Sequence, residues 1–314
     1  MIWTPERNKV QGLLIADLYG QADDVACERN AVMAGGLRGA DKASALAQQG
    51  IDPTLYLTIS IDDLIEEMAA RELIPRISGL SPLDAADLVH AEAQFLAKRL
   101  GLRALADGRN LIWDITMASA PSVEPWLSTM RLAGYAATGI FVEIDLEESV
   151  RRSEAEHRRG HDEYRNGRGY GGRYVAADAI RALADTPAGA RRCAAQTALI
   201  QPSAAPGDRP FGSFRGAVTG RIAAYITGGL TLDALAEEFR TRCWPDVPSV
   251  CPPGMEAAAP AIDDPEPSVP GSFDDVVLAY DLGWLTDADY AALAEAAVCA
   301  PRRRRPYGCA GLPG

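Results

Sequence analysis

The chain has 314 residues, of which 47% are hydrophobic and 24% charged, so it can bury a core and is not disordered overall. Its net charge of −12 argues against nucleic acid as a partner, because tracking phosphates needs a positive surface. Six cysteines without a CxxC pair and only three histidines form no zinc-site pattern, so we predict no metal site of that kind. No signal-peptide pattern and no run of 18 apolar residues occur, which predicts a cytoplasmic protein outside the membrane.

Strand-like and helix-like segments alternate over the first 160 residues. In chain order the patterns predict a strand over 31–36, a helix over 40–50, a strand over 54–63, a helix over 81–108, a strand over 110–116, a helix over 121–134, a strand over 135–145 and a helix over 146–160. Ser81 and Pro82 suit the start of the longest helix, and Gly108 suits its end. This alternation favours an α/β fold with a parallel sheet and crossover helices.

From about residue 186 the patterns weaken, and 246–272 is rich in proline and small residues, as an extended or disordered linker would be. Around it, 224–235 and 279–290 align at an offset of 55 residues, and Thr231 and Thr286 are the predicted N-caps. We interpret these segments as two helical hairpins, with chance similarity between alanine-rich helices as the alternative. The predicted domains are therefore 1–200, a hairpin over 201–245, the linker over 246–272, and a second hairpin with a basic tail over 273–314.

A degenerate phosphate-loop motif, GLRGADKA at 36–43, follows the first predicted strand. A P-loop has the pattern G-x-x-x-x-G-K-[ST], in which backbone N–H groups surround the phosphate, the lysine reaches its oxygens and the hydroxyl binds Mg²⁺. Here Lys42 keeps the lysine position, Asp41 replaces the second glycine, and Ala43 replaces the Mg²⁺ ligand. The candidate nucleotide-binding residues are Gly36, Gly39, Lys42 and Ser44.

Polar residues follow the second and third predicted strands. Asp62 and Asp63 end the second, and Asp114 and Thr116 end the third. Ligands of open α/β sheets bind beyond the carboxyl ends of the strands. A carboxylate there can accept the proton of a substrate hydroxyl during phosphoryl transfer. A helix cap is the other interpretation of the Asp62–Asp63 pair.

Six segments, in their order along the chain, resemble the zeta-toxin family, especially its actinobacterial branch. They are MAGGLRGADKAS, YLTISIDDL, GLSPLDAADLVHAEAQFLAKRL, RNLIWDITMAS, MRLAGYAATGIFVEIDLEESVRR and EHRRGHDEYRNGRGYGGRYV, and they cover about residues 25–180. The resemblance implies a P-loop NTPase or kinase-like parallel sheet flanked by helices, here with an α-helical C-terminal extension. Studied members of the family phosphorylate UDP-N-acetylglucosamine with ATP, and some are neutralised by a small helical antitoxin. The implied cofactors are ATP and Mg²⁺, and the implied partners are a nucleotide-sugar substrate and an antitoxin or other protein held by the C-terminal hairpins.

Carried over residue by residue, the resemblance also implies roles in catalysis. Lys42 would be the P-loop lysine, Asp62 the general base, and Arg173 the lid arginine that neutralises charge on the transferred phosphoryl group. Glycines in the arginine-rich stretch before Arg173 would make that lid mobile, although a solvated helix face also fits the stretch. The implied substrate-binding residues are Asp63, Glu92, Asp114 and Thr116.

The sequence departs from the family where nucleotide and Mg²⁺ would be handled. Besides Asp41 and Ala43, Ser60 stands at the first carboxylate position of the family's D-x-D, and Glu156 stands where this branch carries an arginine. Losing one oriented electrostatic contact costs about 10²–10³ in rate. Two functions remain open: a nucleotide-sugar kinase acting as the toxin of a toxin–antitoxin system, and a non-catalytic relative used as a binding or structural module in a phage or antitoxin-type complex.

Overall fold

The computed structural model describes residues 3–184, 216–251 and 253–300. The chain divides into two compact units. We call residues 10–214 with 248–268 the core unit, and residues 1–9 with 215–247 and 269–314 the helical unit. The predicted boundary between residues 200 and 201, and the predicted basic tail, lie outside the described residues.

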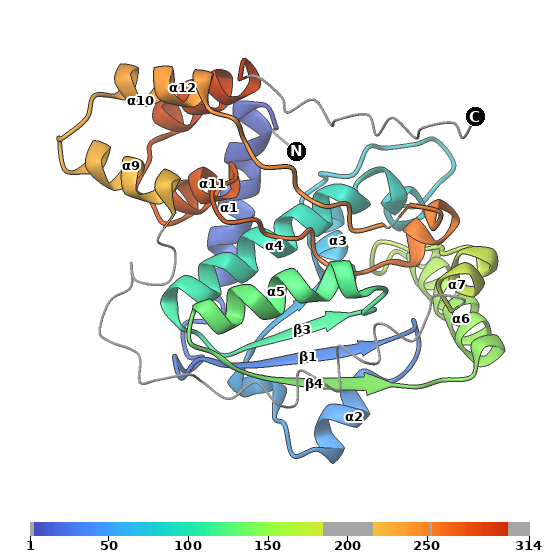
Figure 1. The fold of residues 1–314 in the computed structure, drawn as a ribbon. Coiled ribbons are helices and arrows are strands. Elements are labelled where there is room, and N and C mark those ends of the chain that lie inside the picture. The colour runs from blue at the N-terminus through green and yellow to red at the C-terminus, as the bar shows by residue number, and fades with distance from the viewer. Residues whose placement is uncertain (1–2, 185–215, 252, 301–314) are drawn as a thin grey trace, which may run out of the picture. The chain divides into compact units, whose positions relative to one another are not determined.

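The core unit is built on one parallel sheet with the strand order β2-β3-β1-β4 (Figure 1). This confirms the predicted α/β fold of P-loop NTPase and kinase-like type, a parallel sheet flanked by helices. The described elements of the core unit are the greater part of α1 (Pro5–Gly20), β1 (Asn30–Gly36), α2 (Lys42–Gln48), η1 (Pro53–Leu55), β2 (Leu57–Ser60), α3 (Ile61–Ala70), η2 (Pro82–Leu88), α4 (His90–Asp107), β3 (Leu111–Ile115), α5 (Ala120–Leu132), β4 (Ala136–Val142), α6 (Leu146–Arg165), α7 (Ala177–Ala184) and η3 (Glu256–Ala261).

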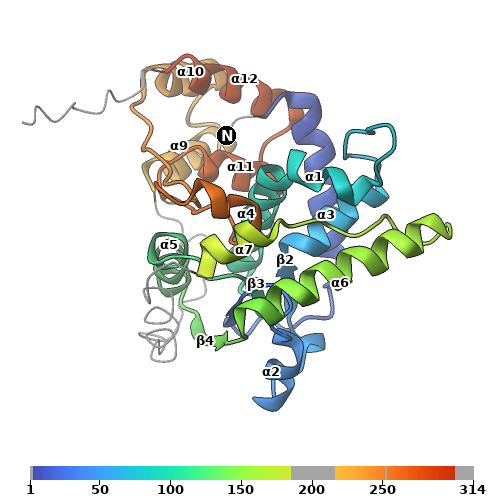
Figure 2. The ribbon, with the colours of Figure 1, turned by 90° about the vertical axis from the view of Figure 1, so that its right-hand side faces the viewer.

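Alternating side chains along the strands fill two cores, one on each face of the sheet. Val32 and Ile112 pack with Leu46 of α2. Trp113, next to Ile112, faces the other way and meets Trp126 of α5, with ring centroids 4.6 Å apart. Figures 1 and 2 show α4 and α5 on the face of the sheet opposite α2.

The parallel register brings the carboxyl ends of three strands together. Asp114 of β3 pairs with Ser60 of β2 and with Ala34 of β1. Asp114 therefore lies between the loop that follows β1 and the start of α3, at the edge where ligands of such sheets bind.

The second predicted strand is shorter than expected. It ends at Ser60, whose hydroxyl accepts the backbone N–H of Asp63 at 3.3 Å and caps α3. Asp62 and Asp63 therefore lie in the first turn of a helix, not on a strand, and neither is its N-cap.

The long predicted helix over 81–108 is divided in two at Val89, into η2 and α4. Its predicted ends are confirmed. Ser81 forms a capping box with Asp84 at the start, and Gly108 ends α4 with a φ of 74°.

The helical unit contains α9 (Ala217–Ile226), α10 (Leu232–Thr241), α11 (Asp274–Asp281) and α12 (Asp287–Val298). Gly228 and Gly283 end α9 and α11 with φ values of 77° and 74°, and the next N–H in each case donates to the carbonyl five residues back. Thr231 and Thr286 cap α10 and α12, as predicted. The repeat at an offset of 55 residues is therefore matched by hydrogen bonds, which favours a true repeat over chance similarity.

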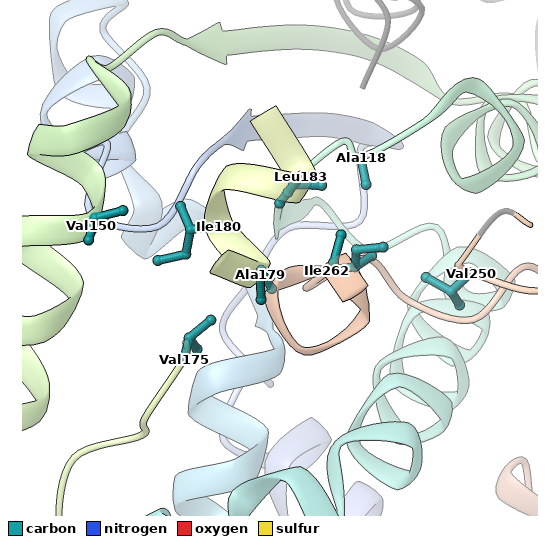
Figure 3. Packing of buried hydrophobic residues seen from close by; sticks show 10 residues of the cluster. Ala118, Val150, Val175, Ala179, Ile180, Leu183, Val250 and Ile262 are labelled. Carbon is teal, nitrogen blue, oxygen red and sulfur yellow. The ribbon is translucent and has the colours of Figure 1, made fainter. Parts of the chain in front are cut away.

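Most of the predicted linker belongs to the core unit. Residues 248–268 pack there, and within them Ala258 and Ile262 are buried, with 0% and 1% of their surface exposed. Figure 3 shows Ile262 beside α7, with Val250 on the side away from that helix, and both belong to one buried apolar cluster. We call residues 256–266 the strap.

Candidate functional site

The phosphate loop between β1 and α2 is packed against β4 and α6. Ser149 and Arg152 of α6 donate to the carbonyl oxygens of two consecutive loop residues, at 2.7 and 2.8 Å. A Cβ at Gly36 would lie 2.7 Å from the carbonyl oxygen of Val142, so glycine is required at this approach. The first glycine of the predicted motif thus stands where the backbone passes too close to a neighbouring strand for any side chain.

Asp41 occupies the position of the missing glycine in both sequence and conformation. Its φ of 60° and ψ of 52° are left-handed values that glycine adopts readily. Its carboxylate accepts the backbone N–H of Ser44 at 3.3 Å, and hydrogen bonding from Ser44 lowers the pKa of Asp41. A negative charge therefore lies at the start of α2, and the N–H of Ser44 is already used.

Lys42 and Asp114 form an ion pair at the carboxyl edge of the sheet, with Lys42 Nζ 2.8 Å from the Asp114 carboxylate. The register explains the contact, because Asp114 lies beside the end of β1. Burial raises the pKa of Asp114, and Lys42 opposes this rise. The structure thus brings together two of the predicted site residues.

Asp62 lies between two guanidinium groups. Arg38 Nη1 and Arg173 Nη1 each donate to one of its carboxylate oxygens, both at 2.6 Å. Its side chain keeps 38% of its surface exposed, so a hydroxyl group can reach it. Glu156 lies 3.4 Å from the other terminal nitrogen of Arg38, so this departure from the family pairs with a loop arginine.

Two glycines position Arg173 by close packing. A Cβ at Gly172 would overlap the backbone of His157 on α6, and a Cβ at Gly160 would lie 2.5 Å from the carbonyl oxygen of Gly171. From the sequence we interpret these glycines as a source of flexibility in a mobile lid. In the structure they instead allow the backbone of α6 and the backbone of the segment before Arg173 to pack in direct contact. Arg173 itself is 4% exposed.

Thr116 lies just beyond β3, and its contacts are with the strap. Its N–H and hydroxyl donate to the Asp264 carboxylate at 3.0 and 2.8 Å. Asp263, next along the strap, accepts from Arg173 Nη1 at 2.7 Å. Sequence reasoning missed both strap carboxylates and the role of Arg38, although Arg38 lies within the predicted loop.

Glu92 is not brought to this group of residues. It is 4% exposed and accepts from Gln11 Nε2 at 2.6 Å. On α4, His90, Gln94 and Lys98 point instead to the strap. A substrate contact by Glu92 would require α4 or α1 to move.

Asp63 lines a different cavity from Asp62, one of about 480 Å³ that is also lined by Ser60, Glu66 and Glu67. Restricted hydration by neighbouring protein atoms, followed by repulsion from Asp114 and Asp62, raises the pKa of Asp63 to about 6, although its side chain still reaches solvent.

We expect Asp63→Asn to stabilise the protein above pH 6. Asp63 holds its proton more tightly in the folded than in the unfolded chain, so its ionisation lowers stability as pH rises from about 3.8 through about 6. The thermal midpoint of the variant should exceed that of the wild type at pH 7.5, and the difference should shrink at pH 4.5. Glu67→Gln, on the same cavity, is the control. An equal difference at both pH values would contradict the assigned ionisation.

The cavity beside Asp62 is small, about 160 Å³, and is lined by Arg38, Glu156, Arg159 and Arg173 among others. Pockets that enclose drug-sized ligands are about 300–1,000 Å³. A nucleotide sugar therefore needs more room than the described conformation offers next to the candidate base.

The residues fit an ATP–Mg²⁺ complex only in part. Lys42 and the loop amides suit phosphate oxygens, but Ala43 has no oxygen for the metal and Asp41 brings a negative charge. In the part of the chain that the structure describes, no group of three or more His, Cys, Asp or Glu side chains is arranged to hold a metal ion. The phosphate loop therefore does not provide the hydroxyl ligand that Mg²⁺ has in a P-loop.

A family model described as an AAA domain matches residues 32–167, from β1 to the end of α6. The match covers less than half of the chain, and together with the fold it supports a P-loop NTPase-like kinase family. No curated protein and no solved structure matches the chain. Among the described helices, none is both long and apolar enough to cross a membrane.

Proposed function

We propose that the core unit is an ATP-dependent phosphotransferase whose acceptor is a nucleotide sugar of the UDP-N-acetylglucosamine type. The observation that carries the proposal is the position of Asp62. It lies between Arg38 and Arg173 at the same edge of the sheet as the Lys42–Asp114 pair. A candidate base and three cations for phosphate therefore converge, in a core whose segments resemble the zeta toxins.

In this proposal Asp62 accepts the proton of the acceptor hydroxyl while the hydroxyl oxygen bonds to the γ-phosphorus. The bond between that phosphorus and the bridging oxygen breaks, and ADP leaves with the electron pair. Lys42 and Arg173 would stabilise charge on the phosphate oxygens, since guanidinium and ammonium groups bind such oxygens through charge-assisted hydrogen bonds. If phosphorylation of this cell-wall precursor stopped growth, the protein would act as a toxin.

The test is transfer from γ-labelled ATP to UDP-N-acetylglucosamine by the full chain, followed by separation of the labelled sugar nucleotide. We expect Asp62→Asn to lower the rate about a hundredfold with ATP affinity unchanged, because a positioned base contributes roughly 10²–10⁴. Glu67→Gln on the same helix is the matched control, since its partner is Arg71. No sugar-nucleotide-dependent transfer by the wild type, or an unchanged rate in Asp62→Asn, would contradict the proposal.

A second candidate function is a non-catalytic binding module. The charge of Asp41 at the phosphate loop favours it, because like charges oppose phosphate binding. Calorimetric titration separates the two functions. Binding of both ATP and UDP-N-acetylglucosamine supports the kinase, whereas binding of the sugar nucleotide alone supports the module.

A further inference from the structure

The strap lies across the carboxyl end of β3 and places its Asp264 carboxylate there. Asp264 is fully buried, with 0% of its surface exposed. It accepts five hydrogen bonds of 2.6–3.0 Å, from the N–H groups of Thr116, Met117 and Ala118 and from the hydroxyls of Thr116 and Ser122.

The backbone that holds Asp264 is shaped as an anion cradle. Met117 has a φ of 53°, a left-handed value that is rare for such a side chain, and this turn aims three successive N–H groups at one carboxylate. The N-terminal end of α5, which favours negative charge, follows immediately at Ala120. The cradle is filled by the chain's own carboxylate.

Asp263 occupies a second charged position. It accepts from Arg173 Nη1 at 2.7 Å and lies 3.2 Å from His90 Nε2, while Arg173 Nη2 donates to the Pro260 carbonyl at 2.8 Å. Burial opposes its ionisation, but Arg173 and then His90 hold the pKa of Asp263 well below its usual range. Both terminal nitrogens of Arg173 are therefore engaged, one with Asp62 and Asp263 and the other with the strap backbone.

Two further contacts and an apolar anchor hold the strap. Lys98 Nζ lies 2.6 Å from Glu266, and Gln94 Nε2 donates to the Ile262 carbonyl at 2.9 Å. Ile262 is buried in the cluster of α6 and α7 seen in Figure 3. Three carboxylates of the strap therefore have positively polarised partners: Asp263 contacts Arg173, Asp264 lies in the backbone cradle, and Glu266 contacts Lys98. A ligand with several anionic groups would make contacts of the same kind.

We propose that the strap is an internal competitor of the acceptor: Asp263 and Asp264 occupy the positions that the phosphate groups of an anionic ligand would take, and that ligand binds only when the strap leaves. That the ligand is a nucleotide sugar rests on the proposed function. Ligands of this sheet type bind beyond the carboxyl ends of the strands, where the strap lies. Arg173 cannot hold the strap and neutralise a transferred phosphoryl group with the same nitrogens.

Competition between the strap and the ligand predicts how the affinity for the ligand depends on strap docking. The apparent dissociation constant of the ligand equals its intrinsic value divided by the fraction of molecules with the strap released. Any change that weakens strap docking therefore strengthens ligand binding, until release is nearly complete. A segment that instead completes the site would have the opposite effect.

The experiment uses inorganic pyrophosphate as the probe and hydrogen exchange of the strap as a readout besides activity. The amides of Asp263 and Glu266 report docking, because they donate to Thr116 Oγ1 and to the Gln94 carbonyl. We expect pyrophosphate to accelerate their exchange in the wild type. We expect the Asp264→Asn variant to bind pyrophosphate at least tenfold more tightly than the wild type. The asparagine amide places N–H donors against the N–H and hydroxyl donors of the cradle, which weakens docking of the strap.

Gln94→Ala is a second variant that loosens the strap without touching strap or cradle, in case Asp264→Asn does not fold. Glu256→Gln, on the exposed start of the strap, is the matched control and should behave as the wild type. The proposal is wrong if both loosened variants bind pyrophosphate no more tightly than the wild type, or if bound pyrophosphate leaves exchange at Asp263 and Glu266 unchanged, as binding at the phosphate loop would. Because pyrophosphate is not a sugar nucleotide, strap competition without transfer to UDP-N-acetylglucosamine would count against the proposed function alone.

Discussion

Replacing Asp41 by glycine and Ala43 by serine should strengthen binding of ATP with Mg²⁺ at least a hundredfold. Asp41 already has the left-handed backbone that glycine adopts without strain, so the loop keeps its path. The change removes a negative charge from the start of α2 and returns a hydroxyl ligand for the metal. Outer-shell partners of a bound metal are worth roughly 10–100-fold in metal affinity and a direct ligand at least as much, and the two gains are not expected to be additive.

Single variants separate the two causes. Asp41→Asn removes only the charge, since asparagine tolerates the same backbone, and Ala43→Ser adds only the hydroxyl. Calorimetric titration with and without Mg²⁺ should show the gain from Ala43→Ser only with the metal. The thermal midpoint should change little in Asp41→Gly, because loss of the cap on Ser44 and relief of the left-handed conformation oppose each other. Weaker binding in Asp41→Gly would mean that Asp41 is itself a metal ligand.

The α/β core could be predicted because its signals are local. Alternating apolar patterns indicate the strands, and Ser81 and Gly108 carry their own cap chemistry, so the ends of the η2–α4 segment followed from sequence. The helix α3 was missed, although the signal for its start was present in the sequence. Ser60 followed three residues later by Asp63 is an N-cap pattern, but the apolar run before it concealed the boundary.

The partners of the site residues could not be predicted in the same way. Polar residues occur on two sides of α4, with Glu92 on one and His90 on the other, and periodicity does not say which side meets the site. The contacts of the strap are even harder to predict from the sequence. Its proline and small residues are typical of a linker, and the contact between Asp264 and Thr116 joins residues 148 apart in the chain. Only the folded sheet edge, with its turn at Met117, creates the cradle that holds this segment.

Gly101→Ala should destabilise the core unit by about 2 kcal/mol. Gly101 lies in α4 against Trp113, and a Cβ there would overlap the six-membered part of the indole ring. Trp113 is 1% exposed and also packs against Trp126, with ring centroids 4.6 Å apart, so it has little room to move. Overpacking of this severity costs about 3 kcal/mol, whereas the higher helix propensity of alanine returns about 1 kcal/mol.

Thermal unfolding followed by circular dichroism measures this effect. For a unit of this size 1 kcal/mol corresponds to about 2–4 °C, so the midpoint should fall by about 4–8 °C. Gly20→Ala, at the end of α1, is the matched control because nothing lies within 4 Å of its added Cβ. Its midpoint should stay the same or rise slightly, since only helix propensity and chain entropy change there. An unchanged midpoint in Gly101→Ala would mean that Trp113 can shift, and that the two tryptophans do not fix the distance between α4 and the sheet that supports Asp114.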